Sequence, residues 1–181
     1  MIFSKRKAFI SHYKGDRREV DAFVQGFGGV FIPKVLGAND NDEFINSANT
    51  DYVMQRIREK YLEDSTVTIV LLGSCTHSRR YIDWEIKSSL QQGKYLPNGL
   101  MGIVLPSQNN TAHLPERLKA NWKQNHEGCY ARYWSYPTSQ QQLWGWIEDA
   151  YQARTTRTNL IDNSLPMMGY NSKCTICKVT H

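Results

Sequence analysis

The segment of this sequence best suited to chemistry is the run Tyr81-Ile-Asp-Trp-Glu85, in which a glutamate follows two aromatic residues. A fixed carboxylate can stabilise a developing positive charge or move a proton. The rings of Tyr81 and Trp84 could form walls of a small-molecule site. The same residues also fit a purely structural role, because acids are favoured in the first turn of a helix and aromatic residues fill cores. On spacing alone, the structural role is the stronger interpretation.

Polar side chains directly follow two strand-like segments. One segment is the short run 7–11, and the other is 66–72, which is nearly continuously apolar, as in a central parallel strand buried on both faces. The polar residues after these two segments are Ser11, His12, Asp16, Ser74 and His77. Simpler roles exist here too: a histidine after a strand is often a turn residue, and Asp16 could cap the helix that begins at Arg17.

The rest of the chain must supply the elements that bring these residues together. Short apolar runs alternate with segments of helical periodicity, which indicates a parallel sheet with helical crossovers. The expected strands are 7–11, 30–33, 66–72, 99–106 and 130–136. The expected helices are 17–26, 50–62, 79–92, 115–122 and a last helix capped by Ser139. In the helix 50–62, we expect Tyr52, Val53, Ile57 and Tyr61 on the inner face. We therefore predict an α/β, flavodoxin-like domain over residues 1–154, with strand order 2-1-3-4-5, helices on both faces and an irregular tail over 155–181.

In such a sheet, ligands bind beyond the carboxyl ends of the strands where the strand order reverses, here between the first and third strands. The polar residues that follow these strands should meet there. On the helix after the third strand, Ile82, Ile86 and Leu90 form the expected buried stripe, and Glu85 lies on an adjacent stripe. The polar loop 34–49 is long enough to fold over the same site, and long loops are often functional.

Composition restricts the function classes without choosing among them. The chain has 181 residues and a formal net charge of +5, with basic residues scattered along it. A scattered distribution favours an ordinary surface that attracts anionic ligands, such as a dinucleotide, over a nucleic-acid interface. No signal-peptide pattern is present, and the apolar runs are too short to cross a bilayer. We expect a soluble cytoplasmic protein without membrane contact.

Four cysteines occur in the sequence: Cys75, Cys129, Cys174 and Cys177. The spacing of Cys174, Cys177 and His181 resembles a metal-binding pattern, but it provides three ligands at most, and structural zinc normally takes four. A fourth ligand would have to come from elsewhere in the fold. We expect free thiols and no metal.

Four segments in order resemble the TIR-like domain family of Thoeris antiphage defence. They are Lys7-Ala-Phe-Ile-Ser-His-Tyr13, Val30-Phe-Ile-Pro33, 65–73 and Ser78-Arg-Arg-Tyr-Ile-Asp-Trp-Glu-Ile86. The resemblance covers roughly residues 5–150, and the order and spacing of the segments carry it.

The resemblance implies an enzyme that uses NAD as its substrate and needs no further cofactor. Such proteins cleave the nicotinamide–ribose bond and make a cyclic ADP-ribose-type signal that activates a partner effector. By position, Glu85 matches the catalytic glutamate. Ser11 and His12 match the residues that flank the pocket after the first strand, and Tyr81 matches an aromatic residue four positions before the glutamate. Together with Asp16, Ser74, His77 and Trp84, which the predicted topology places at the same edge of the sheet, they are the expected substrate-binding residues. A phage-protein trigger and self-association are further partnerships that the family suggests.

Two other functions remain open on the sequence. A TIR-like domain can act as a non-catalytic protein–protein interaction module, and one sequence does not separate this from catalysis. A phosphoacceptor receiver shares the topology but places an aspartate at the end of the third strand, where this chain has Leu72-Gly73-Ser74.

Overall fold

A computed structural model describes residues 4–35 and 49–180 and shows a five-stranded sheet, entirely parallel, in the order β2-β1-β3-β4-β5. This confirms the predicted fold class and strand order. The strands are β1 (Arg6–Ser11), β2 (Phe31–Val35), β3 (Val67–Leu72), β4 (Gly99–Val104) and β5 (Arg132–Trp134). Every residue of β3 and β4 is buried, as expected for central strands covered on both faces.

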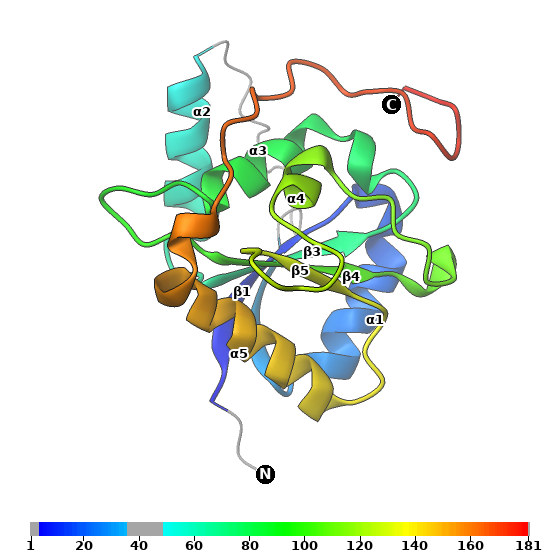
Figure 1. Cartoon of the computed structure of the whole chain (residues 1–181). Coiled ribbons are helices and arrows are strands. Elements are labelled where there is room, and N and C mark those ends of the chain that lie inside the picture. Colours follow the sequence, from blue (N-terminus) through cyan, green and yellow to red (C-terminus); the bar gives the residue numbers. More distant parts are fainter. Residues whose placement is uncertain (1–3, 36–48, 181) are drawn as a thin grey trace.

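Helices cover both faces of the sheet (Figure 1). They are α1 (Arg17–Phe27), α2 (Thr50–Ile57), α3 (Arg80–Ser89), α4 (Glu116–Ala120) and α5 (Gln140–Thr156). Helices α1 and α5 pack on one face with alternate residues of β3, including Ile69 and Leu71. Helices α3 and α4 pack on the other face, against Val70 and Leu72. Alternation along β3 therefore divides the apolar side chains of this strand between two cores.

Strand β2 continues two residues past its predicted end. Pro33 lies opposite Ala8 of β1, and the strand runs on to Val35. A proline is tolerated here because β2 is an edge strand, whose outer side needs no ladder donor. The predicted loop 34–49 therefore starts later than expected, and its residues 36–48 lie outside the described part of the chain.

Helix α2 begins as predicted but has a different buried face. The side chain of Asn49 caps it by accepting a hydrogen bond from the backbone N–H of Tyr52, at 3.1 Å. The inner face consists of Val53, Met54 and Ile57, whereas Tyr52 is 49% exposed. The prediction that Tyr52 lies on the inner face was wrong, because the buried stripe begins one residue later.

The tail after α5 crosses over α3 toward the amino-terminal end of that helix. Asn163 Nδ2 donates to the carbonyl of Lys87, near the end of α3, at 3.0 Å. The backbone N–H of Arg80, at the start of α3, donates to Asn171 Oδ1 at 2.9 Å, and Ser172 N donates to the Ser78 carbonyl. The tail thus runs antiparallel to α3 and covers it from solvent (Figure 1).

A buried ion pair joins α3, α4 and the tail. The guanidinium of Arg117 is wholly buried and donates to both carboxylate oxygens of Asp83, with Nε 2.8 Å from Oδ1. Arg117 also donates to the carbonyls of Leu165 and Pro166, and Asp83 accepts from the backbone N–H of Met168. Such a pair is costly to break from one side, because the remaining charge stays buried without compensation.

No helix among the described residues is long and apolar enough to cross a membrane.

Replacing Arg117 should strongly destabilise the protein. We expect Arg117→Met to lower the free energy of unfolding by about 3–5 kcal/mol in a urea titration, because Asp83 loses its buried cation. The matched control is Asp21→Ala, which breaks the exposed Arg17–Asp21 pair and should cost about 0–1 kcal/mol. Equal losses in the two variants would contradict the role assigned to the buried pair.

Candidate functional site

The carboxylate of Glu85 meets the end of strand β1 at the position where the strand order reverses. Ser11 is the last residue of β1 and is buried, and its hydroxyl donates a hydrogen bond to Glu85 Oε2 at 2.5 Å. Glu85 lies in the second turn of α3, next to the buried stripe of Ile82 and Ile86. The fold therefore brings together the first strand and the third helix through one polar contact.

Burial governs the charge of Glu85. Desolvation raises the pKa of its carboxyl to about 8, and the hydrogen bond from Ser11 opposes this by lowering the pKa. The residue is only 9% exposed. Among the described residues, none of the ion pairs includes Glu85. Near neutral pH the group is therefore mostly a neutral acid, which would ionise when a positive charge comes close.

Asp16 lies against the loop that follows β3. Its carboxylate contacts Gly73 so closely that a Cβ at that position would collide with it, which explains why a glycine is needed there. Burial and the nearby Glu19 raise the pKa of Asp16 to about 6, and Arg79 opposes this. Asp16 occupies the N-cap position of α1, but its side chain makes no capping hydrogen bond, so the structural role considered from the sequence is not realised.

Arg79 is a buried residue of this region that the sequence analysis did not identify as functional. It is the N-cap residue of α3, and its guanidinium stacks 3.8 Å from the centre of the Tyr13 ring. Within the described part of the chain, its Nε and Nη2 atoms have no hydrogen-bond partner, and neither does Oδ2 of Asp16. Buried polar atoms normally have partners. These groups are therefore suited to contact a polar ligand.

His12 and Ser74 lie at the predicted edge of the sheet but do not contact Glu85 through a hydrogen bond. His12 Nδ1 is 3.3 Å from the carbonyl oxygen of Ile10, and burial lowers the pKa of its imidazole, so the ring is neutral at pH 7. Ser74 donates weakly to the sulfur of Cys75 at 3.7 Å. The structure thus places Ser11 and Glu85 in contact and His12 one residue beyond the end of β1.

The remaining candidate residues face the tail. Trp84 is buried against Phe9 of β1, and its Nε1 donates to the Met168 carbonyl at 2.9 Å. Tyr81 packs edge-on against Trp84, with ring centres 5.1 Å apart. His77 Nε2 forms a hydrogen bond with the Thr175 hydroxyl at 3.0 Å. These three side chains connect α3 and the preceding loop to the tail.

Two surface hollows lie at the opposite edge of the sheet. One has a volume of about 320 Å³ and is lined by residues that include Ser65 and Asn98, which precede β3 and β4. The other, of about 580 Å³, lies between α2 and the region around Tyr95. Neither hollow includes Glu85, so the buried carboxylate and these two hollows are separate features.

A comparison with protein-family models matches residues 9–110 to the model described as "Thoeris protein ThsB, TIR-like domain". The match includes Ser11, Asp16 and Glu85 and ends before α4. A comparison with curated proteins gives no match.

The burial of Glu85 should leave a characteristic pH dependence of stability. The pKa is raised on folding, so the folded protein holds a proton that the unfolded chain releases, and stability is lost as the pH rises from about 4.5 to about 8. We expect Glu85→Gln to remove this dependence. In urea titrations at several pH values, the free energy of unfolding of the variant minus that of the wild type should increase by about 1.4 kcal/mol per pH unit across that interval.

The matched control is Glu63→Gln, which changes an exposed acid. Its stability profile should run parallel to that of the wild type. If the Glu85→Gln profile also ran parallel, the assigned burial of an ionisable Glu85 would be refuted.

Proposed function

The chain belongs to the Thoeris ThsB family of TIR-like domains, and we propose that it uses NAD to make a cyclic ADP-ribose-type signal for a partner effector. Membership supports a role in antiphage defence. The observation that carries the catalytic proposal is the position of Glu85, which meets Ser11 where the strand order of the sheet reverses.

One carboxylate is enough for the proposed cleavage. Breaking the bond from ribose to the cationic nicotinamide ring leaves an oxocarbenium-like ribose, while nicotinamide departs as a neutral molecule. The electron pair of the breaking bond goes to nicotinamide, so no general acid is needed. A carboxylate at the position of Glu85 stabilises the positive ribose, and the effect is stronger in a buried site than in water.

Substrate binding is expected to put Glu85 into its charged form. In the free protein, burial holds the pKa of this carboxyl at about 8. A cationic nicotinamide riboside placed beside it favours the carboxylate, which lowers that pKa. The proton leaves to solvent as the substrate enters, and the hydrogen bond from Ser11 then holds the charged oxygen in place.

Arg79 and Asp16 provide polar contacts of the kind that a dinucleotide requires. The Nε and Nη2 atoms of Arg79, which have no hydrogen-bond partner among the described residues, can donate to a phosphate, for which a guanidinium is well suited. Oδ2 of Asp16, likewise without a partner in that part of the chain, can accept from a ribose hydroxyl. We assign these two roles as part of the same proposal. The net charge of +5 would also favour the approach of an anionic substrate.

A non-catalytic interaction module is the second candidate function, and the near-complete burial of Glu85 favours it. A side chain that is 9% exposed presents little surface to a substrate. In that case the contact between Ser11 and Glu85 would serve only to hold α3 against β1. The two candidates make opposite predictions for NAD turnover.

Purified protein should release nicotinamide from NAD in a manner that depends on Glu85. We expect Glu85→Gln to reduce the initial rate about 10²–10³-fold, as for the loss of a group that stabilises transition-state charge. Nicotinamide and nucleotide products would be followed by chromatography, with and without lysate from phage-infected cells. The matched control, Glu63→Gln, should retain the wild-type rate. Identical product traces for wild type and Glu85→Gln would favour the interaction module.

The hydrogen bond from Ser11 should determine the pH profile of this activity. Because Glu85 acts as a carboxylate, kcat/KM should rise with pH toward a plateau above about 8, the pKa in the free protein. Ser11→Ala removes a contact that lowers this pKa, so the rising limb should move to higher pH. Ser88→Ala is the control, since Ser88 is buried on the same helix but donates to the Met54 carbonyl. If the rising part of the kcat/KM profile of Ser11→Ala stayed at the same pH as in the wild type, the role of Ser11 would be refuted.

A further inference from the structure

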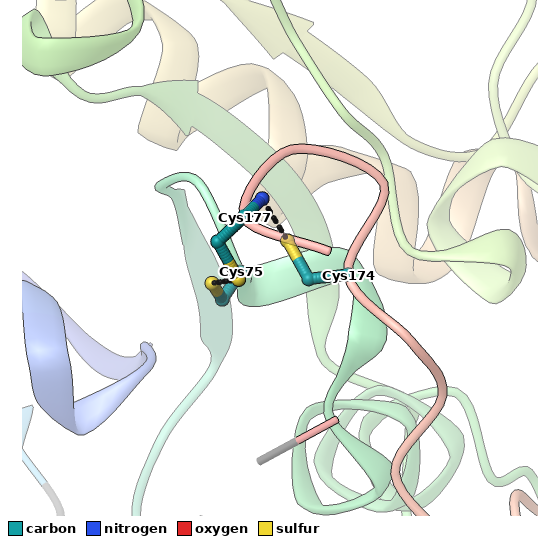
Figure 2. A group of neighbouring side chains, drawn as sticks. All are labelled: Cys75, Cys174 and Cys177. Carbon is teal, nitrogen blue, oxygen red and sulfur yellow. Dashed lines mark hydrogen bonds between the residues drawn. The ribbon is translucent and has the colours of Figure 1, made fainter. Parts of the chain in front are cut away.

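Three cysteine sulfurs gather where the tail meets the loop after β3 (Figure 2). Cys75 follows β3, and Cys174 and Cys177 lie near the end of the tail. All three sulfurs are within 4.8 Å of one another, and those of Cys75 and Cys177 are 3.5 Å apart. The sequence grouped Cys174 and Cys177 with His181, and we expected no metal there; the fold adds Cys75 to the two tail cysteines.

The spacing of the sulfurs suits a metal ion. A tetrahedral zinc ion with bonds of about 2.3 Å to sulfur holds its ligands about 3.8 Å apart along each edge. The separation of 3.5 Å between Cys75 and Cys177 is close to that edge. A disulfide bond requires about 2.05 Å. Among the described residues, no disulfide bond joins these cysteines.

The backbone around Cys174 is arranged to stabilise a thiolate. The N–H groups of Ile176 and Cys177 both donate to the sulfur of Cys174 at 3.4 Å. The turn closes through Lys178 N to the Cys174 carbonyl and through Cys174 N to the Val179 carbonyl, each at 3.0 Å. Lys178 adopts a left-handed conformation with φ 63°, which allows this tight reversal. Hydrogen bonds from the surroundings to ligating atoms are typical of metal sites.

The two buried thiols differ in how easily they ionise. Burial would raise the pKa of Cys174, but the hydrogen bonds from Cys177 and Ile176 lower it below its ordinary value. Burial raises the pKa of Cys75 to about 11, so this thiol stays protonated on its own. A bound cation reverses that preference, because a coordinating thiol is deprotonated outright.

We propose that Cys75, Cys174 and Cys177 bind a structural zinc ion that fastens the tail to the loop after β3. Thiolate ligands in a tetrahedral arrangement favour zinc over harder cations. Among the described residues, these three cysteines are the whole group of His, Cys, Asp and Glu side chains close enough to share one ion. His181, which the spacing suggested, lies outside the described residues.

The site would stabilise the region that leads to Glu85. The loop after β3 continues through the short helical turn Thr76–Ser78 into α3. Zinc would hold that loop from the side of the tail, next to the hydrogen bond between His77 and Thr175. The family match ends at residue 110, so two of the three ligands lie beyond the part of the chain that it covers.

Metal content and cysteine replacement test the proposal. Protein purified from zinc-supplemented medium should hold about one zinc ion per chain by mass spectrometry of the metal. Cys174→Ser and Cys177→Ser should each lower the zinc content at least about tenfold. The matched control is Cys129→Ser, because Cys129 is also buried but lies outside the cluster. It should keep the wild-type content.

A second measurement does not depend on any variant folding. Addition of Co²⁺ to the wild-type protein after zinc removal should give absorption from thiolate-to-cobalt charge transfer and from a tetrahedral d–d transition.

A chelator should lower the Tm of the wild type and of Cys129→Ser but leave the Tm of Cys174→Ser unchanged. The proposal fails if the wild type neither contains nor takes up zinc, or if intact-mass analysis shows a Cys75–Cys177 disulfide instead. It also fails if Cys129→Ser loses as much zinc as Cys174→Ser and Cys177→Ser.

Discussion

The burial of a carboxyl group at the carboxyl edge of the sheet is the constraint on which the rest of this structure depends. In the described part of the chain, Glu85 has a serine hydroxyl as its neighbour and no cation, so the domain accepts an acid whose pKa is raised to about 8. A residue with only a structural purpose could be replaced by an apolar one at lower cost. Buried ionisable groups that reduce stability are concentrated at functional sites. The burial of Glu85 therefore connects the fold to the proposed chemistry.

The sequence was sufficient for the topology because the signals that determine it are local. The continuously apolar run that became β3 and the alternation of strand and helix require a parallel sheet, and Ser139 caps α5 by accepting from Gln142 as its type and position suggest. The meeting of Ser11 with Glu85 followed from topology, since both lie beside the same reversal of strand order. Tyr52 was misplaced because helical periodicity alone does not fix which neighbouring residue begins the buried stripe.

Residues whose surroundings come from distant parts of the chain were not predictable. Arg79 is one of two successive arginines, and nothing local shows that it turns inward over Tyr13. The tail has no periodicity, yet it contacts the whole length of α3. Cys75 lies 99 residues before Cys174 in the numbering, and only the fold brings them together. In each case the deciding contact joins segments far apart in sequence, where local patterns carry no information.

The path of the tail also bears on the order in which the protein can mature. Strands β1 and β3 and helix α3 are synthesised well before the tail, and domains tend to fold from the amino terminus as they emerge. Until residues 165–168 have left the ribosome, Trp84 lacks the Met168 carbonyl and Arg117 lacks those of Leu165 and Pro166. A nascent chain therefore has its Glu85 region before it has the covering of α3.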